Sequence, residues 1–317
     1  MSGSLVPTWI FDPFLPPELV ERVLDKLGHR GPPPTTIDGL TDLYRSWCRA
    51  VPFDNVQFVL RSPLPSGDEP VGLPARTFFA EWLRDGTGGL CGPATWAWHS
   101  LLRACGFPSA CAIAAINGDH LNHLTAVVEL DGTRHVVDAA YQNEVPVPLR
   151  VEAESRGYGT GLHEATVRPS GSSWIVTYRA PAQPGDHHCL LSERDANPRV
   201  LAGGLRRGAL SRMMWMAGGD QAANRRVRSS LFCRRNTADG HVVVIGPQVI
   251  RVRHDSGIIG PGVETLEAGL RALGYSSAIV ERLGQISALA DQDGLEVGSS
   301  PFFAPGATHH LRRSAGR

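Results

Sequence analysis

Apolar residues recur at helical spacing near the start of the chain and at strand-like spacing over much of the remainder. Three amphipathic segments predict helices, at 16–27, 37–50 and 77–84. The proline run at 32–34 and the breaker-rich stretch from 60 to 74 predict the loops between them. Residues 1–85 are therefore expected to form a helical bundle.

A fourth helix is predicted to follow Cys91. Apolar side chains after this residue repeat with the period of one helix face, and Gly106 with Pro108 predict the end of the helix. Pro93 suits the first helical position, where a missing N–H group costs nothing. We therefore expect Cys91 to lie just before the positive end of the helix dipole, which favours thiolate over thiol.

Short strand-like runs with turn residues between them come next. They lie at 110–116, 123–130, 133–138, 165–168 and 174–179, and they predict a small barrel or curled sheet in residues 86–182. Residues 183–283 combine a helical stretch, strands at 230–235, 241–245 and 248–253, and a closing helix. Residues 284–317 have little periodicity, so a loose tail is expected. The whole pattern predicts an α+β fold.

Asp131 and Gly132 are a two-residue turn signal between the second and third of these strands. If they form the loop, Glu129 lies opposite Arg134, and this opposite-charge pair supports the register. Continued along the hairpin, the register pairs Thr125 with Asp138 and His123 with Ala140. His123 and Asp138 then share one face as diagonal neighbours, with backbones roughly 7–8 Å apart.

Cys91, His123 and Asp138 are consequently candidates for a nucleophile, its base and the carboxylate that holds the base in one tautomer. Plainer interpretations exist for each residue. A cysteine is usually a small buried apolar residue, a strand histidine is often a structural hydrogen-bonding group, and an aspartate can simply end a strand. The other five cysteines are expected to be structural. Sequence spacing alone leaves open whether Cys91 meets His123.

These residues resemble the motifs of the arylamine N-acetyltransferase family. Gly88, Gly89 and Cys91 match its Arg-Gly-Gly-x-Cys sequence, and the fifteen residues from His123 to Asp138 match its His-to-Asp spacing. Further similar segments are Thr36–Leu43, Pro52–Val56, Ser229–Phe232, Ala238–Gly240 and Glu264–Tyr275. The similarity extends from about residue 10 to residue 285.

The resemblance implies a helical bundle, a central β-barrel and a C-terminal α/β lid, on a core like that of cysteine proteases and transglutaminases. It also implies catalysis by Cys91, His123 and Asp138. An acyl group would pass from acetyl-CoA, or another acyl-CoA or acyl-carrier thioester, through a Cys91 acyl-enzyme to a small-molecule amine. No metal is implied.

The chain departs from the family pattern around the thiol. Thr87 replaces the family arginine, with Arg84 as a candidate substitute, and Pro93 and Thr95 replace a glutamate and an asparagine. The segment after Asp138 reads Ala-Ala-Tyr-Gln, and residues 201–226 resemble an insertion. Three alternatives therefore stay open: an amide synthase that uses a larger carrier-bound acyl chain, a thiol hydrolase or transglutaminase-like enzyme, and a noncatalytic scaffold.

Composition narrows the classes of partner. The formal net charge is zero and there is no concentrated basic stripe, which argues against nucleic acid. The longest apolar runs are too short to cross a membrane, and cysteines without framework spacing favour a cytoplasmic location.

His120, His123 and the His187-His188-Cys189 cluster lack the spacing of a zinc site. Six arginines between 206 and 228 form either a solvated helix face or a phosphate-binding stretch, and Met213–Met216 form either core or an acyl pocket.

Overall fold

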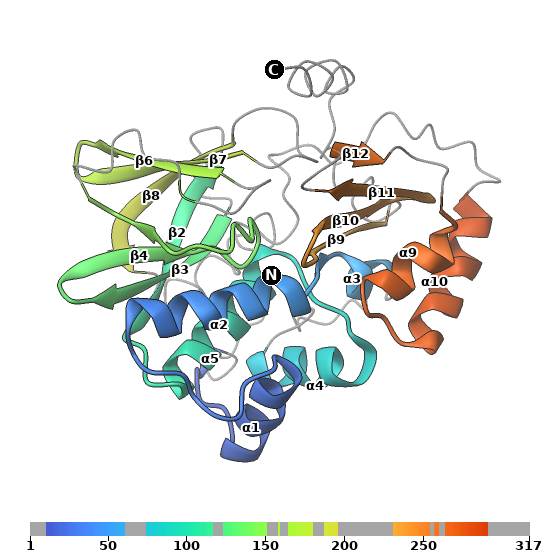
Figure 1. Ribbon diagram of the computed structural model, residues 1–317, viewed down its shortest axis with the longest axis horizontal. Coiled ribbons are helices and arrows are strands. Elements are labelled where there is room, and N and C mark those ends of the chain that lie inside the picture. The colour runs from blue at the N-terminus through green and yellow to red at the C-terminus, as the bar shows by residue number, and fades with distance from the viewer. Residues whose placement is uncertain are drawn as a thin grey trace, which may run out of the picture.

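The structure is a computed structural model that describes residues 11–60, 74–116, 123–150, 158, 164–179, 187–195, 231–253, 257–259 and 264–290. Figure 1 shows helices at the base of the molecule and two sheets above them, one on each side. One sheet has seven strands and the other has five. The mixed α+β class is confirmed.

The N-terminal helices follow the predicted pattern closely. They are α1 (Pro17–Lys26), α2 (Ile37–Ala50), α3 (Val56–Leu60) and α4 (Ala75–Asp85). Thr36 caps α2, because its side chain accepts a hydrogen bond from the Gly39 N–H. Gly86 ends α4 with φ 76°, a left-handed conformation that suits glycine. The short helix α3 was not predicted.

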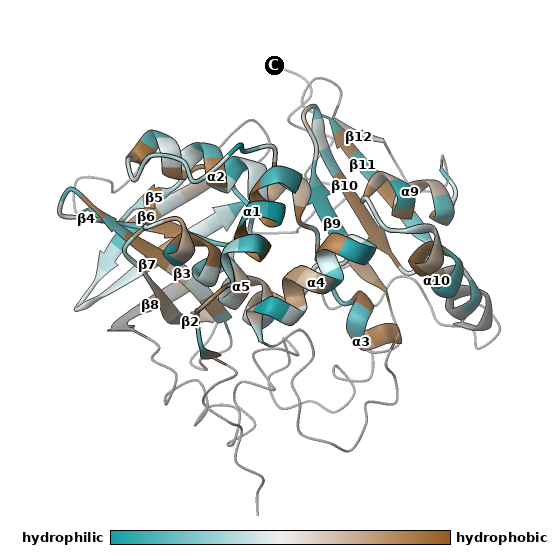
Figure 2. Ribbon diagram, turned by 90° about the horizontal axis from the view of Figure 1, so that it is seen from below, coloured by the Kyte–Doolittle hydropathy of each residue, from teal (hydrophilic) through white to brown (hydrophobic). Residues whose placement is uncertain are grey.

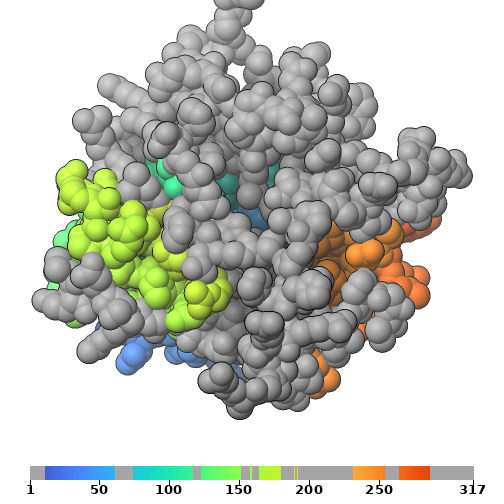
Figure 3. Space-filling view, turned by 90° about the horizontal axis from the view of Figure 1, so that it is seen from above, coloured from blue at the N-terminus to red at the C-terminus, as the bar shows by residue number. Residues whose placement is uncertain are grey.

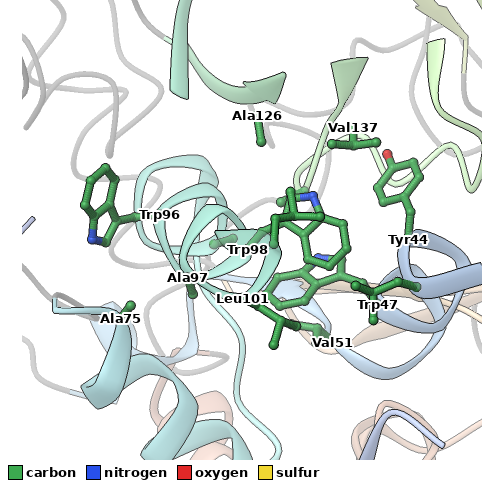
Figure 4. Packing of buried hydrophobic residues seen from close by; sticks show 14 of the residues in the cluster. Tyr44, Trp47, Val51, Ala75, Trp96, Ala97, Trp98, Leu101, Ala126 and Val137 are labelled. Carbon is green, nitrogen blue, oxygen red and sulfur yellow. The ribbon is translucent and has the colours of Figure 1, made fainter. Parts of the chain in front are cut away.

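Helix α5 (Cys91–Ala104) is buried on every side from Cys91 to Leu102, although one apolar face was expected. It packs against α4 on one side and against strands β2 (Ser109–Ile116) and β3 (His123–Leu130) on another. Figure 4 shows Trp98 of α5 beside Trp47 of α2, and their ring centroids are 4.9 Å apart. Because the helix lies at the centre of the fold, its polar side chains are buried as well as its apolar ones.

The seven-stranded sheet carries the predicted hairpin. Its remaining strands are β4 (Thr133–Val137), β5 (Val147–Pro148), β6 (Glu164–Ser170), β7 (Ser173–Arg179) and β8 (His187–Asp195), and the order is β5-β4-β3-β2-β8-β7-β6. Asp131 and Gly132 have φ values of 49° and 69°, as a type I′ turn requires, and Glu129 pairs with Arg134 as predicted. The ladder ends at Ala126 and Val137, so the predicted pairs Thr125–Asp138 and His123–Ala140 do not form.

This sheet is open among the described residues, so the expected β-barrel is not confirmed and the alternative of a curled sheet stays open. Strands β5 and β6 lie at its two edges, and no described ladder joins them. Strand β5 is only two residues long and ends in Pro148, which has no N–H to donate. The outer edge of β6 is occupied by Tyr158, which bridges to Ala165.

The five-stranded sheet joins two distant parts of the chain. Its order is β1 (Phe53–Asp54), β9 (Phe232–Asn236), β10 (Gly240–Ile245), β11 (Gln248–Arg253) and β12 (Gly257–Ile259). Strand β1 therefore crosses from the helical part into this sheet. Helices α9 (Leu266–Ala272) and α10 (Ser277–Ala290) cover one face, where Figure 2 shows hydrophobic residues along β10. In Figure 3 the yellow-green atoms that include β6 and β7 and the orange atoms of the C-terminal part lie on opposite sides of the molecule.

The C-terminal helices correct two expectations. The predicted closing helix is two helices, since Gly274 adopts φ 89° between them. Helix α10 also continues to Ala290, so residues 284–290 are helical where a loose tail was expected. Within the described residues, none of the helices is both long and apolar enough to span a bilayer.

Candidate active site

Cys91 is the first residue of α5 and is buried, with 2% of its surface exposed. The helix begins two residues earlier than predicted, so Pro93 occupies the third helical position. A proline is tolerated there because the first N–H groups of a helix have no intrahelical acceptor. Leu90 precedes Cys91 and provides no side-chain cap. The sulfur therefore lies at an uncapped positive helix end.

The Gly88-Gly89 segment places Cys91 by packing against strand β1. The Gly88 N–H donates to Asp54 Oδ2 at 2.7 Å, and Gly89 forms a parallel bridge with Phe53. A Cβ atom on Gly88 would lie 1.7 Å from the Pro52 carbonyl oxygen. Only glycine fits this contact, which explains the first glycine of the motif.

Asp54 is a buried carboxylate that sequence reasoning did not single out as a site residue. It also accepts from the Val56 N–H at 3.1 Å and from the Tyr275 hydroxyl at 2.8 Å. Burial raises its pKa to about 6, against the lowering effect of these hydrogen bonds. Asp54 thus ties the Cys91 loop to the segment between α9 and α10.

His123 and Asp138 meet as the sequence predicted. His123 begins β3 and Asp138 follows β4, and His123 Nε2 donates to Asp138 Oδ2 at 2.6 Å. Both side chains are buried. With Nε2 committed to the carboxylate, Nδ1 is the ring nitrogen left for another partner.

Cys91 lies near enough to His123 to act on the imidazole, through a side-chain hydrogen bond and through its charge. Burial alone would lower the pKa of the imidazole. The charge and hydrogen bond of Asp138, together with Cys91, outweigh burial and raise the pKa of His123 to about 10. The structure therefore brings together all three predicted residues, including the Cys91–His123 contact that spacing had left open.

Asp138 is held ionised by a tight turn. The N–H groups of Ala140 and Tyr141 both donate to its Oδ1 at 2.9 Å, and the Tyr44 hydroxyl donates to its backbone carbonyl at 2.8 Å. Burial favours the neutral acid, but His123 and the two N–H donors prevail and lower the pKa of Asp138. An ionised carboxylate can stabilise a charged imidazole.

Tyr141 adjoins the imidazole and is itself contacted by a second tyrosine and a cysteine. The Tyr141 ring lies 5.5 Å from the His123 ring and stacks on Tyr178 at 4.1 Å between centroids. Tyr141 also forms a hydrogen bond with Cys189. Tyr178 was not singled out from the sequence, and Cys189 was considered only as part of the His187-His188-Cys189 cluster. Cys189 lies on β8, a strand that was not predicted from the sequence.

The departures from the family pattern are buried and hydrogen-bonded. Thr87 accepts from Gln57 Nε2 at 2.9 Å, and Thr95 donates to the Leu124 carbonyl at 2.8 Å. Arg84 is exposed and pairs with Asp85, so it does not take the place of the family arginine. Thr87 and Pro93 therefore place neutral groups where the family has an arginine and a glutamate, whereas Thr95 replaces a neutral asparagine.

Several other candidates cannot be placed. His120, the arginines between 206 and 228, Met213–Met216 and the insertion at 201–226 lie outside the described residues, as do the side chains of His187 and His188. Within the described part of the chain, no group of three or more His, Cys, Asp or Glu side chains could hold a metal ion.

Comparisons with known proteins agree with this geometry. A family model described as N-acetyltransferase matches residues 36–183. Proansamycin X synthase of Amycolatopsis mediterranei (strain S699) is 25% identical over 186 residues, which are 52% of this chain and 68% of that protein. The arylamine N-acetyltransferase of Salmonella typhimurium has the same fold, with TM-score 0.64, 15% identity and coverage of 86% of this chain and 98% of its own.

A second solved structure is that of Mycobacterium marinum arylamine N-acetyltransferase in complex with CoA. It matches with TM-score 0.65 and 16% identity, over 86% of this chain and 98% of its own. At these identities the structural matches establish the fold, while the family model covers the segment that contains Cys91, His123 and Asp138.

Proposed function

We propose that this chain, which belongs to the arylamine N-acetyltransferase family as a divergent member, moves an acyl group from a thioester to an amine through a Cys91 acyl-enzyme. One observation carries the proposal. The buried His123 ring is hydrogen-bonded to Asp138 at 2.6 Å and also interacts with Cys91. This arrangement has the nucleophile, base and orienting group that acyl transfer needs.

In the first half-reaction, His123 accepts the Cys91 proton and the thiolate attacks the thioester carbonyl carbon. The bond from that carbon to the donor sulfur breaks, and the departing thiolate takes the proton from the imidazolium. Backbone N–H groups at the start of α5 stabilise the oxyanion. Acetyl-CoA is the donor that the CoA complex of the Mycobacterium marinum protein supports.

In the second half-reaction, the amine nitrogen attacks the acyl carbon. The bond to Cys91 sulfur breaks, and His123 takes the proton that the amine loses. Asp138 stabilises the imidazolium in both halves and keeps Nε2 as the nitrogen that faces the carboxylate. Water must be excluded from the acyl-enzyme, and the part of the fold built on β9–β12 acts as the lid.

One observation favours a second candidate, an amide synthase with a larger carrier-bound acyl chain. The curated relative is named a synthase, and it is 25% identical over 52% of this chain. The neutral Thr87 and Thr95 beside Cys91 add to this, because they alter the surroundings of the thiol. Six cysteines without a disulfide support a reducing, cytoplasmic location for either activity.

Intact-protein mass spectrometry with a panel of acyl thioesters tests these proposals. We expect the acetyl adduct on Cys91, and release of free CoA that depends on an arylamine or hydrazine. If only longer carrier-bound thioesters acylate Cys91, the protein is an amide synthase and not an acetyltransferase. Release of CoA with water alone would indicate a hydrolase, and the absence of any adduct would indicate a noncatalytic scaffold.

A further inference from the structure

Arg234 is a buried arginine next to the candidate active site that the mechanism above does not use. It lies on β9 opposite Phe53 of β1 and is only 2% exposed. Its Nη2 donates to the Ala140 carbonyl oxygen, and its guanidinium carbon lies 5.3 Å from the centre of the Phe53 ring. Its Nε and Nη1 have no hydrogen-bond partner among the described residues.

The hydrogen bond from Arg234 acts on the turn that holds Asp138. Ala140 accepts from Arg234 through its carbonyl group and donates to Asp138 Oδ1 through its N–H at 2.9 Å. A connected path therefore runs from the guanidinium through Ala140 to the Asp138 carboxylate, and from there to His123. Asn236, two residues along β9, donates to the Gln142 carbonyl at 2.8 Å and anchors the same segment further on.

Burying the Arg234 guanidinium costs free energy, and no carboxylate among the described residues forms an ion pair with it. Removing a guanidinium from water destabilises its charged form. Burial therefore lowers the pKa of Arg234 to about 10, although the nearby Tyr141, Asp138, Cys48 and Tyr44 act to raise it. No salt bridge joins Arg234 to a carboxylate in the described residues. A buried cation with a single protein acceptor is a poor source of stability, and its one hydrogen bond to the Ala140 carbonyl points to a role in geometry.

We propose that Arg234 is a positioning residue that holds the Ala140 peptide, and through it the Asp138 carboxylate, in line with His123. Strand β9 belongs to the sheet opposite the hairpin, so the third part of the fold sets the geometry of the base. The inference rests on the proposed function and extends it, because it assigns part of the active-site geometry to a strand far from Cys91 in sequence.

The test compares Arg234→Met, which removes charge and donors but keeps the aliphatic volume, with Arg234→Lys, which keeps the charge. Arg235→Met is the matched control, because Arg235 is the next residue on β9 and donates to the Ala272 carbonyl at 2.5 Å, away from the triad. Circular dichroism measures folding. Proton NMR follows the His123–Asp138 proton, which a short hydrogen bond moves downfield, and mass spectrometry follows the rate of Cys91 acylation.

Arg234→Met is expected to move the His123–Asp138 resonance upfield and to slow acylation roughly tenfold to a hundredfold at unchanged folded fraction, since small misplacements of catalytic groups have effects of this size. Arg234→Lys should fall between Arg234→Met and wild type, and Arg235→Met should leave both readouts unchanged. If Arg234→Met fails to fold, Arg234→Lys decides the matter, because its shorter side chain cannot reproduce the guanidinium geometry.

The proposal is overturned if the folded Arg234 variants keep the wild-type resonance and acylate within about twofold of wild type. It is also overturned if Arg235→Met causes equal losses. Should wild-type protein form no adduct with any thioester, the proposed function fails, while the NMR comparison still reports whether Arg234 positions Asp138.

Discussion

His123 and Asp138 bond to each other at 2.6 Å beyond the end of the ladder that joins their two strands. The last β3–β4 pair is Ala126 with Val137, so neither residue is held by that ladder. His123 is paired instead with Ala114 of β2, and Asp138 is held by the N–H groups of Ala140 and Tyr141. Their meeting therefore depends on the packing of several elements, and each can be tested separately.

Cys91→Ser should abolish formation of the acyl adduct while leaving the protein folded. A hydroxyl is close in size to a thiol but is a far weaker acid, so the helix end and His123 cannot supply an alkoxide. Mass spectrometry after exposure to acetyl-CoA is the measurement. Cys105→Ser, at the other end of α5, is the control and should acylate normally. An adduct on the Cys91→Ser protein would exclude Cys91 as the nucleophile.

Asp138→Asn should reduce the acylation rate by roughly 10²–10⁴-fold, because an amide favours the wrong imidazole tautomer and cannot stabilise the imidazolium. Asp131→Asn is the matched control. Asp131 lies at the exposed tip of the same hairpin with φ 49°, a conformation that asparagine also tolerates. Stopped-flow measurement of CoA release compares the two. A near-normal rate in Asp138→Asn would mean that another group orients His123.

The protonation of His123 should persist to high pH. Its pKa in the folded protein is about 10, above the ordinary 6.5, so the folded state binds this proton more tightly than the unfolded state. The resulting stabilisation is complete below about pH 6.5 and is lost as the pH rises through about 10. NMR titration of ¹⁵N-histidine-labelled protein measures the midpoint.

The same titration of Asp138→Asn should move that midpoint down sharply, since burial then dominates. A wild-type midpoint near 6.5 would show that the imidazole does not form the buried ion pair described here.

Glu144→Gln should lower the free energy of unfolding by about 2 kcal/mol, because Glu144 accepts charged hydrogen bonds. Its buried carboxylate binds Arg49 of α2 at 3.0 and 2.8 Å and Asn236 of β9 at 3.0 Å, so it joins all three parts of the fold. Glu164→Gln, which affects an exposed pair with Arg179, should change stability by less than about 1 kcal/mol. Urea denaturation compares them, and equal losses would contradict a joining role for Glu144.

Gly88→Ala should destabilise the protein by about 3 kcal/mol or more, because the new methyl group would collide with the Pro52 carbonyl and displace the loop before Cys91. Gly31→Ala provides the comparison, since a Cβ atom there meets nothing within 4 Å. Thermal unfolding of both variants measures the effect. Similar melting temperatures would show that the Gly88 contact can relax without cost.

Local patterns in the sequence determined the regular elements and part of the site. The helix at 37–50 and the strand at 123–130 have the predicted bounds, because periodicity and caps depend on residues close together in the chain. The turn at Asp131 and Gly132 likewise set the β3–β4 register, which runs as far as Ala126 and Val137 and leaves His123 and Asp138 at the same end of the hairpin.

Tertiary structure decided the rest, because contacts between distant segments have no local signal. It brought Cys91 to His123, inserted β1 into the sheet of β9–β12 and left the seven-stranded sheet open. It also placed Asp54 behind the Cys91 loop and Arg234 behind the Asp138 turn. A buried charge far away in the sequence can be recognised as part of a site only when packing shows which backbone group it contacts.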